Sequence, residues 1–156
     1  MRWLLVFMLG MLVVGNTRAQ DAKTAKLAMR YGIEVDLVTY PQATPKDALA
    51  SVLKAIEAGK INYLLAHLAD PDWVDQQVKK DHNGQFEVLV KETTEKIAND
   101  RTSIKELRRF LQEGTWETTD TTATAQLKNV KNRRVYMRKR EGRWFLENSQ
   151  EVKKEK

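Results

Sequence analysis

The hydrophobic period of the chain changes once, near Gly114, and this change limits the folds that it can adopt. Between residues 44 and 113, apolar residues recur three and four positions apart, as on one face of an amphipathic helix. From residue 115 to 148, apolar and polar residues alternate, as in strands with one buried face. Helices followed by closely spaced strands are typical of α+β domains. We therefore predict one α+β domain, with N-terminal helices packed on a curved four-stranded antiparallel meander sheet.

Three segments carry the signals of a helix N-terminus. Thr44 can cap a helix through its hydroxyl, and Pro45 suits the first helical position. Asp70 and Pro71 repeat this arrangement. Residues 103–106 read Ser-Ile-Lys-Glu, which is a capping box. We therefore expect helices to begin at these three points.

The C-terminal part is expected to form strands at residues 115–119, 121–127, 135–139 and 143–148, with turns at Asp120, 129–133 and 141–142. A two-residue turn at 141–142 pairs Met137 with Leu146 on one face of the sheet. The same turn pairs Arg138 with Phe145 on the other face. A bulged turn would shift these pairs by one residue.

The two ends of the sequence read as segments outside the folded domain. Residues 1–19 resemble an export signal, with a positive start, an apolar run at 3–14 and small residues that favour cleavage after Ala19. A retained membrane anchor is the alternative, but the apolar run is shorter than the ~20 residues of a typical span. Residues 20–40 are expected to form a polar arm with a short strand, 41–150 the domain, and 151–156 a charged tail. The mature protein is thus expected to be exported, periplasmic or secreted, without a stable membrane span.

Charge and residue usage exclude several classes of function. Lys and Arg number 27 against 21 Asp and Glu, giving a net charge of +6. Loss of Arg2 and Arg18 with the signal leaves +4, which does not suggest a nucleic-acid partner. The absence of cysteine excludes disulfides, a thiolate nucleophile and a zinc ribbon. We therefore expect no metal and no cofactor.

The order of the segments resembles the nuclear transport factor 2-like superfamily, also called the cystatin-like α+β cone. The resemblance rests on the helix opening at 44–49, its continuation at 56–65, the Trp116 strand and the closing hairpin at 135–146. It is greatest for exported bacterial members that have no assigned activity. It implies a cone with a pocket between helices and sheet, and no particular reaction, since the superfamily contains isomerases, dehydratases, cyclases and binding modules.

Enzymes of that superfamily transfer protons inside the cone, which directs attention to three side chains. His67, Tyr63 and Tyr136 are the nearest equivalents by residue type. His67 flanks the apolar stripe of its helix, so it could face a cavity. A buried histidine bonded to the backbone is the favoured alternative, because no partner motif accompanies it. No residue is assigned as catalytic.

Basic residues gather on the closing hairpin and form the second candidate site. Strand alternation places Arg134, Tyr136, Arg138 and Arg140 on one face, with Phe145 nearby. Such a face can bind an anionic ligand or polymer. The alternative is a solvated face on which Glu141 and Glu147 neutralise the arginines. The candidate ligand-binding residues are His67, Tyr63, Tyr136, Arg138, Arg140 and Phe145.

The acidic stretch from Asp70 to Asp81 does not have the spacing of a calcium loop. We read it as a helix cap followed by a solvated helix face.

The favoured hypothesis is a non-catalytic exported domain that binds a small ligand or a protein partner at the cell envelope. A proton-transfer enzyme of the isomerase or dehydratase type, with its site inside the cone, is the alternative. A third hypothesis is attachment to anionic envelope polymers through the hairpin. An arginine-rich sheet face also favours a monomer over a homodimer.

Overall fold

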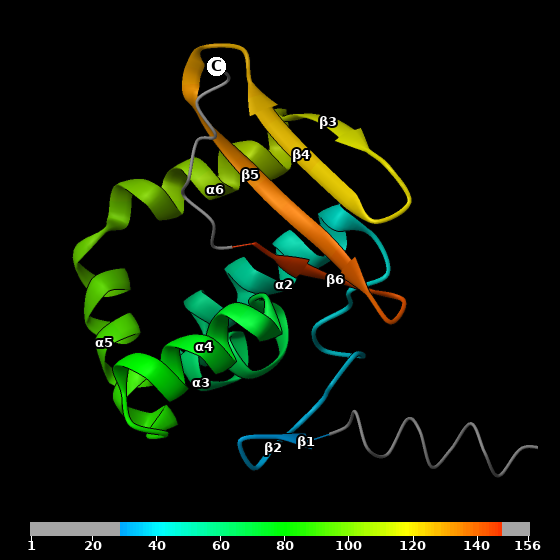
Figure 1. Ribbon diagram of the computed structural model, residues 1–156. Coiled ribbons are helices and arrows are strands. Elements are labelled where there is room, and N and C mark those ends of the chain that lie inside the picture. The colour runs from blue at the N-terminus through cyan, green and yellow to red at the C-terminus, as the bar shows by residue number, and fades with distance from the viewer. Residues whose placement is uncertain (1–28, 148–156) are drawn as a thin grey trace, which may run out of the picture.

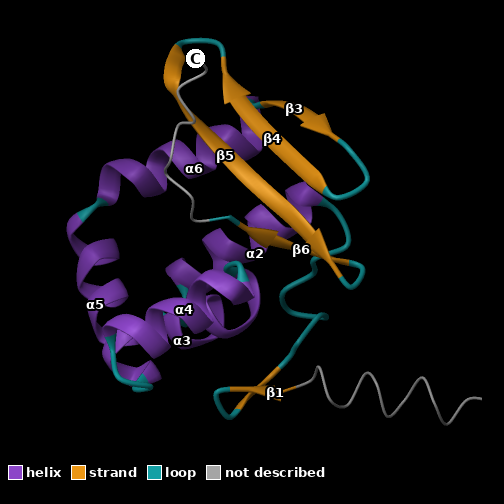
Figure 2. Cartoon of the chain, viewed as in Figure 1, coloured by secondary structure: helices purple, strands orange, loops and turns teal. Residues whose placement is uncertain are grey.

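The computed structural model describes residues 29–147 and shows an α+β architecture, as predicted (Figure 1). Helices occupy the first half and an antiparallel meander the second (Figure 2). The elements are β1 (Met29–Arg30), β2 (Ile33–Glu34), α2 (Pro45–Glu57), α3 (Ile61–Tyr63), the π-helical turn η1 (Leu64–Leu68), α4 (Pro71–Asp81), α5 (Phe86–Asn99), α6 (Arg101–Glu113), β3 (Thr115–Thr118), β4 (Thr122–Leu127), β5 (Val130–Arg140) and β6 (Arg143–Leu146). The predicted export signal and charged tail lie outside the described residues.

Two of the three expected helix starts are confirmed. The Thr44 hydroxyl accepts from the Asp47 N–H at 3.1 Å, and the Asp47 carboxylate accepts from the Thr44 N–H at 3.2 Å. The Asp70 carboxylate caps α4 by accepting from the Asp72 N–H at 3.1 Å. In both helices a proline follows the cap, where its missing N–H costs no hydrogen bond.

The third expected start is wrong, because the cap of α6 lies three residues before Ser103. Asp100 is its N-cap and accepts from the Ser103 N–H at 3.0 Å. Ser103 is therefore the third helical residue, and its hydroxyl bonds to Asp100 at 2.6 Å. Asp100 alone separates α5 from α6, since it follows Asn99 and precedes Arg101 directly.

The sheet has the strand order β3-β4-β5-β6, and the hairpin register is as predicted. Met137 pairs with Leu146, and Arg138 pairs with Phe145. The predicted turn between β4 and β5 is present, but it covers 128–129 and not 129–133, because β5 already begins at Val130. The polar run that suggested a loop belongs to an irregular strand, where the register shifts between Gln126 and Leu127.

Helices α2 and α6 cover one face of the sheet, and no described helix covers the other (Figure 1). Leu49 and Phe110 from these helices pack with Ala125, Met137 and Trp144 of the sheet. A second cluster fills the space among α2, α3, η1, α4 and α5. The two clusters meet at the edge of β6, where the Asp70 N–H donates to the Leu146 carbonyl at 2.8 Å. Within residues 29–147, no helix has both the length and the apolar composition to cross a bilayer.

The part of the N-terminal arm that the structure describes is docked against the helices. The short strand expected in this arm is β2, which is only two residues long and pairs with β1. Residues 36–39 instead form a turn in which the Asp36 carboxylate accepts from two backbone N–H groups. Tyr31 stacks on Phe86 of α5 with ring centroids 4.0 Å apart.

Candidate functional site

His67 lies in η1 and is completely buried. Its Nε2 lies 2.8 Å from the Ile33 carbonyl oxygen of β2. A carbonyl only accepts hydrogen bonds, so Nε2 carries the proton and Nδ1 is a bare lone pair. Burial lowers the pKa of His67, and the charges of Arg143 and Arg30 lower it further. The imidazole is therefore neutral at pH 7 and hydrogen-bonded to the backbone. This is the buried histidine that the sequence analysis favoured over one facing a cavity.

The Tyr63 hydroxyl is also engaged by the arm. It donates to the Asp36 carbonyl at 3.1 Å and accepts from the Asp36 N–H at 2.9 Å. Its ring lies 5.0 Å from that of His67, measured between centroids. Both side chains thus hold residues 33–36 against the helices. The Nδ1 lone pair of His67 has no partner, but His67 is completely buried, so a substrate at the surface reaches neither side chain.

Tyr136 is not part of this group. It alternates along β5 with Val135 and Met137, which belong to the core, and so it faces away from the helices. The three residues proposed for proton transfer are therefore divided between the core and the outer face of the sheet. Two surface depressions are prominent on the described residues, and neither is lined by His67 or Tyr63.

The strand registers arrange the outer face of the sheet in rows of side chains across the strands. Gln126 pairs with Thr115 on one side and with Arg134 on the other. The next rows along the sheet consist of Glu117, Thr124 and Tyr136, then Thr122, Arg138 and Phe145, and last Arg140 and Arg143. We call this surface the outer sheet face, and its first row Thr115–Gln126–Arg134.

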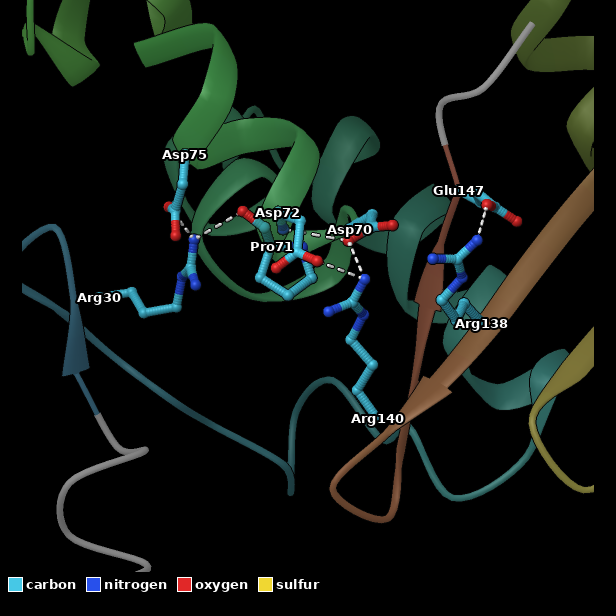
Figure 3. A network of polar contacts seen from close by, with 8 residues as sticks. All are labelled: Arg30, Asp70, Pro71, Asp72, Asp75, Arg138, Arg140 and Glu147. Atoms are coloured by element: carbon cyan, nitrogen blue, oxygen red, sulfur yellow. Dashed lines mark hydrogen bonds and ion pairs between the residues drawn. The ribbon is translucent and has the colours of Figure 1, made fainter. Parts of the chain in front are cut away.

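Two of the candidate arginines are neutralised within the chain (Figure 3). Arg140 reaches from the end of β5 to the start of α4, where it lies 2.6 Å from the Asp72 carboxylate and 3.4 Å from that of Asp70. Arg138 pairs with Glu147 just beyond β6. The Glu147 pairing was expected from the sequence, whereas the partners of Arg140 come from α4.

Phe145 is buried, although it belongs to the outer sheet face. The Arg143 guanidinium lies over its ring, 5.2 Å from the centroid. Burial lowers the pKa of Arg143. Phe145 therefore does not offer a free aromatic surface to a ligand.

A contact network around Asp75 of α4 was not foreseen. Arg30 donates to the Asp75 carboxylate at 2.5 Å and to the Pro71 carbonyl at 3.4 Å (Figure 3). Asp75 also accepts from the Tyr31 hydroxyl at 2.6 Å. Burial, the hydrogen bond to Asp75 and its charge raise the pKa of Tyr31 to about 12. No local pattern signals these contacts, because the partners lie more than 40 residues apart.

A depression of about 380 Å³ opens at the first row, beside the β4–β5 turn. It is lined by Thr115, Gln126, Leu127, Lys128, Val130 and Arg134. The Gln126 amide fits its surroundings only with its oxygen toward Arg134, where it accepts from Nη2 at 2.7 Å and from Nε at 2.5 Å. Of these residues the sequence indicated only Arg134. Thr115 and Gln126 lie beside it in the regular strand register, whereas Val130 comes opposite Leu127 only after the register shift.

The second depression, of about 710 Å³, lies at the corner between α5 and α6. It is lined by Glu92, Glu95, Lys96, Asn99 and Asp100. In the part of the chain that the structure describes, no three His, Asp or Glu side chains are grouped so that they could hold a metal ion.

Comparisons with protein-family models, with curated proteins and with solved structures gave no match.

Proposed function

We propose that the chain is an exported, non-catalytic binding domain of the cell envelope that takes a small ligand on its outer sheet face. One observation carries this proposal: the depression beside the β4–β5 turn lies on the face that no described helix covers, and hydrogen-bonding side chains line it. Its volume is about 380 Å³, and it is open to solvent.

The state of the core supports binding over proton transfer. Catalysis needs an acid or base within reach of the substrate. The Nε2–H of His67 is engaged by the Ile33 carbonyl and the hydroxyl of Tyr63 by Asp36. A substrate would have to displace the docked arm to reach either group.

We propose in addition that the chain is exported and that it belongs to a known superfamily. The apolar run before Ala19 supports export. The order of helices and meander strands supports a place among the exported members of the nuclear transport factor 2-like superfamily. In that reading the ligand lies outside the cone, on the face of the sheet opposite the helices.

The absence of native cysteine permits a direct test. An environment-sensitive fluorophore is attached to a T124C variant, in the middle of the outer sheet face, and to a K79C control on the exposed side of α4. The probe is the soluble mixture released by digesting peptidoglycan, which contains neutral sugars and carboxylates. We expect a saturable fluorescence change in T124C alone, with the probe recovered chemically unchanged. No change in T124C, an equal change in both variants, or conversion of the probe would contradict the proposal.

A further inference from the structure

We propose, resting on the function above, that the ligand of the outer sheet face carries a single oxyanion, a carboxylate or phosphate group. The residues that bind it are Arg134, Lys128, Thr115 and Gln126. The inference comes from the hydrogen-bonding character of this depression and from the pairing of the charges around it.

The side chains that line the depression offer hydrogen-bond donors. Arg134 and Lys128 have donors and no acceptors. The oxygen of Gln126 accepts from Arg134, and its NH₂ group, which points the other way, is a donor. The Thr115 hydroxyl can donate as well. A group of donors with positive charge selects a ligand that only accepts, and a carboxylate or phosphate does so.

Arg134 is also held in place before any ligand binds. Gln126 lies directly opposite it in the register and bonds both Nε and Nη2. A guanidinium fixed in this way loses less side-chain entropy on binding. The amide carries no charge, so it orients Arg134 without neutralising it.

Within residues 29–147, carboxylates neutralise three neighbouring arginines but neither Arg134 nor Arg143, and Arg143 lies over the Phe145 ring at the far end of the face. Arg133 pairs with Glu106, Arg138 with Glu147, and Arg140 with Asp70 and Asp72. Among residues 29–147, no carboxylate forms an ion pair with Arg134 or Lys128. Glu117 lies in the adjacent row of the same face, beside Thr115, and makes no such pair. A bound anion would supply the missing counter-charge.

The same charges argue against a polyanion. A polymer with many negative groups would need a run of free cations along the sheet. Arg138 and Arg140 cannot provide it, because each is already paired, and the unpaired Arg143 lies over Phe145 at the far end of the face. Val130 adds a small apolar surface to the depression, whereas Leu127 is buried and belongs to the core.

The test uses NMR titration of residues 20–156 with two separate probes, inorganic phosphate and acetate, which distinguish the two oxyanion classes. We expect saturable shifts of the Arg134 Nε–H and of the Gln126 side-chain NH₂. An R134Q variant should bind the preferred probe about tenfold or more weakly, the effect of losing a charge-assisted hydrogen bond. R143Q is the matched control, since it removes the same charge from the same face away from the depression, and its affinity should stay within about twofold by simple charge screening.

A second variant tests the same site without removing Arg134. Q126E keeps the oxygen that orients Arg134, but it replaces the NH₂ donor with a negative charge. We expect that the probe no longer shifts the Arg134 Nε–H signal in Q126E, while the backbone amide signals remain those of a folded protein. Equal weakening in R134Q and R143Q, or unchanged binding in Q126E, would overturn the oxyanion site. If the peptidoglycan digest still changes the T124C signal in that case, the proposed function stands and only its ligand class fails. If no ligand perturbs the outer sheet face, the proposed function itself fails.

Discussion

At the scale of single residues, His67 links protonation to folding. It is buried, and burial lowers the pKa of its imidazole in the folded state. An unfolded histidine has a pKa of about 6.5. The unfolded chain therefore takes up the proton first as the pH falls. The contribution of neutral His67 to stability is complete above about pH 6.5 and declines below it, until the pH reaches the folded-state pKa.

Replacing His67 by glutamine should flatten this pH dependence. A glutamine amide can still donate to the Ile33 carbonyl, but it does not titrate. We expect the loss of unfolding free energy between about pH 7.5 and about pH 5.5 to be smaller in H67Q than in the natural chain. Urea unfolding at the two pH values measures it, and H82Q, which removes the other histidine, is the control. An H67Q variant that keeps the full pH dependence would show that other groups cause it.

At the scale of elements, the start of α4 joins the helical half to the sheet. Asp70 caps the helix through its side chain, and its backbone N–H donates to Leu146 of β6. It is 5% exposed, whereas the side chain of Asp72, which also pairs with Arg140, is 71% exposed. Caps stabilise helices by about 1 kcal/mol, and exposed ion pairs stabilise them less.

We therefore expect D70A to lose about 1–3 kcal/mol of unfolding free energy, since a buried cap and an ion-pair partner disappear together. D72A should lose less than about 1 kcal/mol, because its ion pair is exposed. D70N retains a capping side chain and should fall between them. Urea unfolding at neutral pH compares the three. Equal losses in D70A and D72A would mean that the cap contributes nothing beyond the ion pair.

The number of residues between the two partners of a contact decides whether the sequence could predict it. The caps at Thr44 and Asp70 were predictable because donor and acceptor lie two or three residues apart. The pairing of Met137 with Leu146 followed from the two-residue turn at 141–142. By contrast, the predicted cap Ser103 is wrong for α6, because Asp100, which no predicted capping box included, is the N-cap.

Longer contacts were beyond the sequence pattern. The bond from His67 to Ile33 spans 34 residues, so alternation within the arm could not reveal its docking. Arg134 was visible as one of several arginines. Arg134 differs from Arg138 and Arg140 because those two pair with carboxylates, Glu147 for the first and two aspartates near the start of α4 for the second. The register shift beside Arg134 has no local sequence pattern that would predict it.

At the scale of the whole molecule, the sheet has one apolar face and one polar face. The apolar face is covered by α2 and α6, and the outer sheet face carries threonine, glutamine, tyrosine and arginine side chains. Stable homodimers bury large, mainly apolar interfaces. The large exposed hydrophobic side chains of the described residues lie elsewhere, at Met29, Tyr31, Leu37, Val38 and Val88.

Stacking two copies through the outer sheet face would bring the uncompensated charges of Arg134 and Lys128 toward like charges, which disfavours association. We therefore expect residues 20–156 to sediment as a single species with the mass of one chain. Raising the salt concentration should not produce dimers, because screening removes repulsion but adds no apolar surface. A dimer that persists on dilution would contradict this prediction. If R134Q then dissociated that dimer, Arg134 would belong to a subunit interface, and the anion it binds would be a carboxylate of the second copy.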